Sequence, residues 1–249
     1  MAQLFVKINL SQLLTKSFMC QKIAACSLLV WHMLKGESVR YLLLLGLLVS
    51  TLQSKNTIDP ELVDIQSINP TIRVELFLAA GNTFLGKLYP SNARAYMHKN
   101  VALVLDLIQK ELEPLGLGLK IKDAYRPLRV QKQLWEIVLA MNLKNPGDYI
   151  SDPSVEGGRH PRGIAVDVTL VRLSDGSELV MPPFGFIEQA HQGYMGNDLT
   201  QEQINNREFL KELMTHHGFA LIRCEWWHYN LPNWQDYTPL DLTFEELLS

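Results

Sequence analysis

The stretch GIAVDVTLV, residues 163–171, constrains the fold of this chain most, because it places a carboxylate inside a β-branched run. Its alternation predicts a strand in which Asp167 shares one face with the small residues Ala165 and Thr169, while larger aliphatic residues share the other face. A carboxylate in the middle of such a strand is costly to bury unless it is paired or bound to a cation. The stretch therefore predicts a sheet strand whose acid has a specific partner elsewhere in the chain.

The remainder of residues 57–249 interleaves helical and strand-like patterns. Apolar stripes predict helices, and alternating stretches predict strands. The expected helices span 91–116, 128–143 and 200–218, and the expected further strands span 119–125 and 219–230. These helices are too few to connect a doubly wound parallel sheet. The pattern favours a single α+β domain with a mostly antiparallel central sheet flanked by helices.

The first 56 residues differ from the rest and hold two apolar runs, 23–34 and 41–49. Neither run reaches the roughly 20 apolar residues that a spanning helix needs. Read from Met33, the chain has a cationic start, a short apolar core and then small and polar residues, which is the layout of a secretory signal. We expect residues 1–56 to be a targeting segment and 57–249 to be a periplasmic or secreted domain without a stable membrane span. Alternatively, the segment is an amphipathic helix packed on a cytoplasmic domain, or it follows from a start codon assigned too far upstream.

The overall composition excludes several classes of protein. The hydrophobic content of 47% and the charged content of 20% are ordinary for a globular chain, which argues against extended disorder. The net charge is −3 and no basic run is present, so we expect no nucleic-acid partner. Cys20, Cys26 and Cys224 have no paired spacing, which indicates neither a disulfide framework nor a cysteine-based zinc site. Nothing in the sequence indicates an oligomeric state.

Two histidines and a second acid complete a candidate metal site around Asp167. His160 follows a glycine-rich turn seven residues before this acid, and His228 lies in the C-terminal strand. Two imidazoles and one carboxylate suit a zinc ion that keeps its fourth position open for water. Glu225 then remains beside the water as a general acid and base. Each residue alone has a structural interpretation, but the set H-x(6)-D followed by E-x-x-H is much more specific.

The spacing of Glu225 and His228 conflicts with a regular strand. Residues three apart in a flat strand point to opposite faces of the sheet. If both side chains serve one site, the strand must bulge, twist sharply or end within EWWH. The alternative is that this acid and this imidazole are structural. A shared ion also requires the ligand atoms of His160, Asp167 and His228 to lie within about 4 Å of one another.

The stretches HPRGIAVD and EWWH resemble the signatures of the zinc D-alanyl-D-alanine dipeptidases, the type found in vancomycin resistance. The resemblance also includes VDIQSINPTIRVEL and DAYRPLRVQKQLW, and it covers nearly all of residues 57–235. It implies that His160, Asp167 and His228 bind one zinc ion per chain. The resemblance further implies that Glu225 is the catalytic acid and base. The implied activity is hydrolysis of the D-Ala-D-Ala dipeptide by a zinc-activated water.

The resemblance also assigns a role to Arg126 of DAYRP, which matches the family's transition-state-stabilising arginine. A residue before proline favours extended backbone, so this guanidinium can reach over the sheet toward a developing oxyanion. A salt bridge to Asp123 is the alternative, and it is compatible with the catalytic role. The family often has a serine two residues before its first histidine, whereas this chain has Gly158. Any substrate contact that this serine makes in the family has no side-chain counterpart at residue 158.

Two other functions stay open at this point. A murein D,D-carboxypeptidase or endopeptidase of the same fold would use the same residues in a more open groove. A non-catalytic zinc-binding domain would need the three ligands but neither Glu225 nor Arg126. The presence of both residues favours an enzyme.

Overall fold

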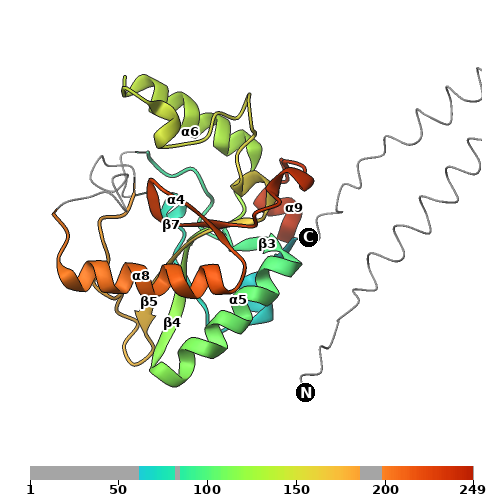
Figure 1. Ribbon diagram of the computed structural model, residues 1–249. Coiled ribbons are helices and arrows are strands. Elements are labelled where there is room, and N and C mark those ends of the chain that lie inside the picture. The colour runs from blue at the N-terminus through green and yellow to red at the C-terminus, as the bar shows by residue number, and fades with distance from the viewer. Residues whose placement is uncertain (1–61, 82–84, 186–197, 249) are drawn as a thin grey trace, which may run out of the picture. The chain divides into compact units, whose positions relative to one another are not determined.

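The computed structural model describes residues 62–81, 85–185 and 198–248 (Figure 1). The signal-like segment 1–56 lies outside these ranges, so the proposed domain boundary stays a prediction. Within the described ranges, no helix combines the length and the apolar character that crossing a bilayer requires.

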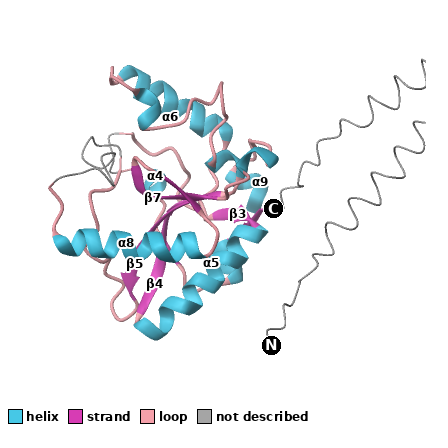
Figure 2. Cartoon of the chain, in the orientation of Figure 1, coloured by secondary structure: helices cyan, strands magenta, loops and turns pink. Residues whose placement is uncertain are grey.

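A five-stranded sheet forms the centre of the domain, with helices on its sides (Figure 2). Its strands follow the order β2 (Arg73–Val74), β4 (Leu117–Asp123), β5 (Ala165–Arg172), β7 (Glu225–Asn230) and β6 (Ala220–Ile222). The short β2 pairs with β4 in parallel, and the other neighbouring strands are antiparallel. A separate antiparallel pair joins β1 (Leu62–Asp64) to β3 (Tyr96–His98). The predicted α+β domain with a mostly antiparallel sheet is confirmed.

Three long helices accompany the sheet in the described ranges: α5 (Lys99–Leu112), α6 (Leu128–Ala140) and α8 (Gln201–His216). Helix α5 contacts β4, while α8 contacts β6 and β7. Shorter helices are α3 (Ile65–Ile68), α4 (Phe77–Ala80) and α9 (Phe244–Leu248). Single 3-10 turns cover Glu113–Leu115, Pro146–Asp148, His160–Arg162 and Trp234–Asp236.

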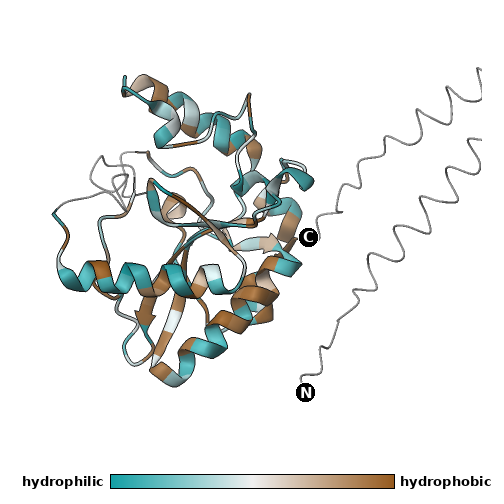
Figure 3. Cartoon of the chain, viewed as in Figure 1, coloured by the Kyte–Doolittle hydropathy of each residue, from teal (hydrophilic) through white to brown (hydrophobic). Residues whose placement is uncertain are grey.

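The core lies between the central strands and the inner faces of these helices. Apolar residues concentrate on β4, on β5 and on one side of α5, whereas α8 presents many polar residues outward (Figure 3). In β5, every residue from Ala165 to Val171 is buried, including Asp167 and Thr169. The strand is therefore covered on both faces, and its carboxylate is inside the protein as the sequence predicts.

Two of the predicted elements are wrong in their limits. The helix expected from residue 91 begins only at Lys99, because Tyr96–His98 forms β3 and the side chain of His98 caps the helix. The segment 219–230, expected as one strand, is a hairpin of β6 and β7 that turns at Arg223 and Cys224. Both differences follow from strand pairing between distant or folded-back segments, which local periodicity does not report.

Candidate active site

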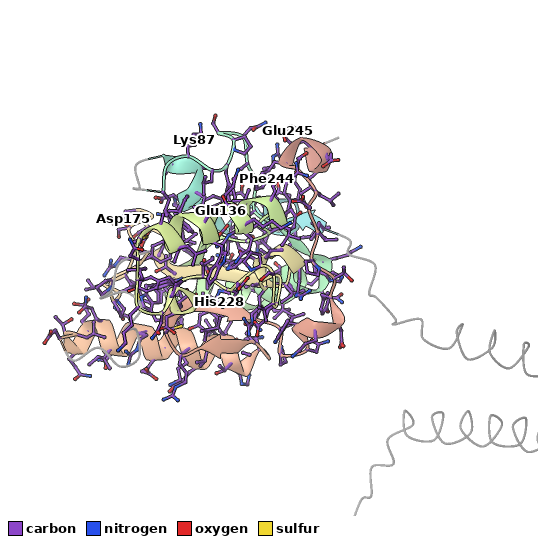
Figure 4. All side chains as sticks on the ribbon, turned by 90° about the horizontal axis from the view of Figure 1, so that it is seen from above. Lys87, Glu136, Asp175, His228, Phe244 and Glu245 are labelled. Atoms are coloured by element: carbon purple, nitrogen blue, oxygen red, sulfur yellow. The ribbon has the colours of Figure 1, made fainter. Side chains whose placement is uncertain are left out.

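Neighbouring strands bring the predicted metal ligands together. In the antiparallel register of β5 and β7, Asp167 lies directly opposite His228. His160 comes from the 3-10 turn just before β5. Its Nδ1 lies 2.7 Å from the carbonyl oxygen of Ala124, which follows β4. Three adjacent strands of the sheet therefore position the set, and Figure 4 shows His228 in the interior of the domain.

The three side chains direct one donor atom each to a common point. His160 Nε2 lies 3.1 Å from His228 Nδ1 and 3.2 Å from Asp167 Oδ1, and His228 Nδ1 lies 3.0 Å from that same oxygen. A tetrahedral ion with bonds near 2 Å holds its ligand atoms about 3.3 Å apart. Because His160 donates its Nδ1 proton to the Ala124 carbonyl, its Nε2 lone pair faces this point. The donor set thus fits a zinc ion without a change of geometry.

The protonation states of the set also suit a metal. Burial alone would raise the pKa of Asp167, but the two imidazoles lower this pKa well below its ordinary value. Burial lowers the pKa of His228, against the effect of its hydrogen bond with Asp167. An ionised carboxylate and a neutral imidazole are the forms that bind metal ions.

Glu225 lies beside this donor set because β7 bulges. In the pairing of β6 with β7, Leu221 lies opposite Tyr229, and the next residue, Ile222, lies opposite Glu225. The three residues 226–228 of β7 therefore have no partner in β6 and form a bulge. As a result, Glu225 Oε2 comes within 3.7 Å of His228 Nδ1, and the predicted break in the strand is confirmed. Burial and the nearby charge of Asp167 raise the pKa of Glu225 well above its ordinary value. A carboxyl group with a raised pKa is suited to accept and return a proton near neutral pH.

Arg126 is buried and held by a network that the sequence shows only in part. Its Nε and Nη2 donate to Asp123 Oδ2 at 3.1 and 2.6 Å, and its Nη1 donates to Gln131 Oε1 at 2.9 Å. Asp123 Oδ1 accepts from the Tyr89 hydroxyl and from the Ala124 amide, both at 2.9 Å. Burial lowers the pKa of Arg126, but the charges of Asp123, Tyr89 and Asp167 and the hydrogen bonds with Asp123 together outweigh burial and raise this pKa. The salt bridge to Asp123, which the sequence left as an alternative compatible with a catalytic role, is present.

The same arginine lines a cavity of about 390 Å³ together with His160 and Glu225. A guanidinium has five N–H donors, and within the described residues Asp123 and Gln131 accept from three of them. One N–H on each terminal nitrogen thus remains for a ligand. The role of Gln131 was missed, although a polar residue on the buried side of α6 is a usable signal.

Aromatic residues form the apolar side of this cavity. Phe184 packs edge-to-face against Trp227, with ring centroids 4.9 Å apart, and against Phe77 at 5.6 Å. Ile222 lines the cavity as well. An apolar wall opposite a few convergent polar groups is the usual form of a small-molecule site.

The turn before His160 depends on two consecutive glycines with positive φ. Gly157 has φ +70°, and a Cβ there would lie 2.8 Å from Pro239 Cγ. Gly158 has φ +74°, and a Cβ there would lie 3.1 Å from Gln131 Cδ and 3.2 Å from Pro161 Cδ. The left-handed conformation and the crowding both disfavour a side chain. A serine at residue 158 would therefore require its neighbours to move.

Comparison with known proteins gives consistent relatives. A family model described as D-ala-D-ala dipeptidase matches residues 59–246. The D-alanyl-D-alanine dipeptidase of Escherichia coli strain K12 is 34% identical over 190 residues, which cover 76% of this chain and 94% of that protein. The D-alanyl-D-alanine dipeptidase of Streptomyces coelicolor is 30% identical over 174 residues, covering 64% and 86%. Among solved structures, VanYB in complex with D-alanine-D-alanine aligns with a TM-score of 0.38 and 15% identity, over 64% of this chain and 86% of that one.

Proposed function

The chain belongs to the D-Ala-D-Ala dipeptidase family, and on that premise we propose that it is a zinc metallopeptidase that hydrolyses the D-Ala-D-Ala dipeptide. One observation carries the proposal: three buried donor atoms lie 3.0–3.2 Å apart, with the carboxylate of Glu225 beside them. A domain that only bound zinc would need the donor atoms but not this acid. It would also not need Arg126 to be held at the same cavity.

The protein's own residues divide the reaction between them. His160, Asp167 and His228 would hold the zinc ion, which when bound polarises the scissile carbonyl and makes water a better nucleophile at neutral pH. Glu225 takes a proton from the attacking water as the new C–O bond forms. It then gives the proton to the leaving amine as the C–N bond breaks. Arg126 donates its remaining N–H groups to the oxyanion, where charge develops in a site shielded from water.

The first test is an assay of the purified protein on D-Ala-D-Ala beside a muramyl pentapeptide. We expect the dipeptide to be cleaved and the protein to contain one zinc ion per chain by metal analysis. Chelation should abolish cleavage, and one equivalent of zinc should restore it, because the three donor atoms form a single ion site. Preference for the pentapeptide would point instead to a murein carboxypeptidase. Bound zinc without cleavage of either peptide would point to a binding domain.

We also propose that the protein is exported, which rests on the sequence pattern of residues 1–56 alone. The expected mature protein begins after about residue 50, where the signal-like pattern ends. Sequencing the N-terminus of protein made in a bacterial host with a working export system measures this directly. Intact protein recovered from the cytoplasm would refute export, and it would leave the proposed activity untouched.

A further inference from the structure

A second arginine lines the cavity, and the mechanism does not use it. Arg159 directly precedes His160, and its side chain is 21% exposed. Its guanidinium lies over the ring of Trp234, 4.7 Å from the ring centroid. The nearest acid is Glu156, whose Oε2 is 3.6 Å from Nη1, a distance too long for a direct hydrogen bond. Stacking on Trp234 and a loose ion pair with Glu156 therefore position Arg159, and within the described part of the chain its N–H groups make no hydrogen bond.

A neighbouring arginine shows what a purely structural role looks like here. Arg162 also lies over Trp234, at 5.2 Å from the ring centroid. Its Nη1 donates to the Tyr237 carbonyl at 2.6 Å, and its Nη2 donates to the Glu156 carbonyl at 2.6 Å. Arg162 is thus buried with its terminal nitrogens bound to backbone. Arg159 shares the stacking but lacks such backbone partners, and it faces the cavity instead.

The charges around the cavity call for a cation of this kind. Among the described lining residues, the acids outnumber the arginines, and they are Asp148, Asp152, Glu156, Asp167 and Glu225. The two lining arginines are Arg126 and Arg159. The charge of Arg126 is matched by Asp123 at 2.6 Å. The proposed zinc ion would offset Asp167, but a dipeptide still brings a carboxylate of its own toward the other acids, so its binding needs a cation whose N–H donors are still available.

We propose that Arg159 binds the terminal carboxylate of the substrate, an inference that rests on the proposed dipeptidase function. A planar guanidinium matches a carboxylate with two parallel hydrogen bonds. Gly158 adds no side-chain donor beside it, and a Cβ there would crowd Gln131 and Pro161 at 3.1–3.2 Å. Arg159 therefore supplies the side-chain donor that Gly158 lacks. It selects peptides whose free carboxylate lies one residue beyond the scissile bond.

The test compares D-Ala-D-Ala with its C-terminal amide, which keeps the scissile bond and removes the negative charge. Wild-type protein should prefer the free acid, and Arg159→Gln should lose on the order of 10- to 100-fold in kcat/KM on the acid, mainly through KM. Both proteins should cleave the amide at the same rate. Arg159→Gln should therefore no longer prefer the free acid over the amide. Arg159→Lys should restore part of it, because charge returns without the planar fork.

Arg94→Gln serves as the matched control, because Arg94 pairs with Asp64 on the surface and does not line the cavity. It should keep the wild-type preference. A role in folding alone would lower cleavage of the acid and of the amide together, and retention of the preference in both Arg159 variants would overturn the inference. Wild-type protein that cleaves the acid but shows no preference also overturns it. If wild-type protein cleaves neither peptide, the proposed function itself fails, and the carboxylate assignment fails with it.

Discussion

Replacing Glu225 with glutamine should leave zinc bound and lower turnover of D-Ala-D-Ala by at least about 10²-fold, the lower end for losing a positioned acid and base. Glutamine keeps the shape of the side chain but cannot take a proton from water. Metal binding should persist because Glu225 lies beside the donor triangle rather than in it, with Oε2 3.7 Å from His228 Nδ1. Zinc content per chain and kcat are measured on the same preparation.

A suitable control is Glu136→Gln, which makes the same chemical change at an exposed position of α6 (Figure 4). This variant should match the wild type in both measurements. Loss of zinc from Glu225→Gln would make Glu225 a ligand. Near-normal turnover with zinc retained would make Glu225 a structural acid, and the proposed mechanism would be wrong.

The sequence predicts the features of this protein that depend on local chemistry. Helix α8 starts at the expected cap, where Thr200 and Gln203 form a capping box. The carboxylate of Asp167 is buried on its strand, and the spacing of Glu225 and His228 requires the bulge that β7 contains. Each of these follows from residues within a few positions of one another. The bulge is notable because a functional argument, not strand propensity, predicts it.

Features that depend on distant contacts could not be predicted in this way. The start of α5 is set by β3, whose partner β1 lies more than 30 residues earlier, since Leu62 pairs with His98. The support for Arg126 joins Tyr89, which precedes α5, to Gln131 on α6. No periodicity connects such segments. The sequence therefore indicates the reacting groups more readily than the residues that hold them in place.

Within the hydrogen-bond network that holds Arg126, Asp123 is the residue whose replacement should lower the stability of the protein most. Its side chain is fully buried and accepts from two nitrogens of Arg126, from the Tyr89 hydroxyl and from the Ala124 amide. Asp123→Ala leaves the Arg126 guanidinium buried without a counter-charge. Breaking a buried pair in this way typically costs about 3–5 kcal/mol of unfolding free energy. We expect a loss of that size in urea unfolding, along with a loss of turnover as Arg126 leaves its position.

The two effects separate when the charge of the partner is also removed. Asp123→Ala combined with Arg126→Leu buries no unpaired charge, so the double variant should recover part of the lost stability while turnover stays low. Glu111→Ala is the control for stability, because Glu111 is 54% exposed and pairs with His217 on the surface. Such a pair contributes at most about 1 kcal/mol. If Asp123→Ala is no more destabilising than Glu111→Ala, the Asp123–Arg126 pair does not support the fold. If the double variant is instead as active as the wild type, Arg126 does not stabilise the oxyanion.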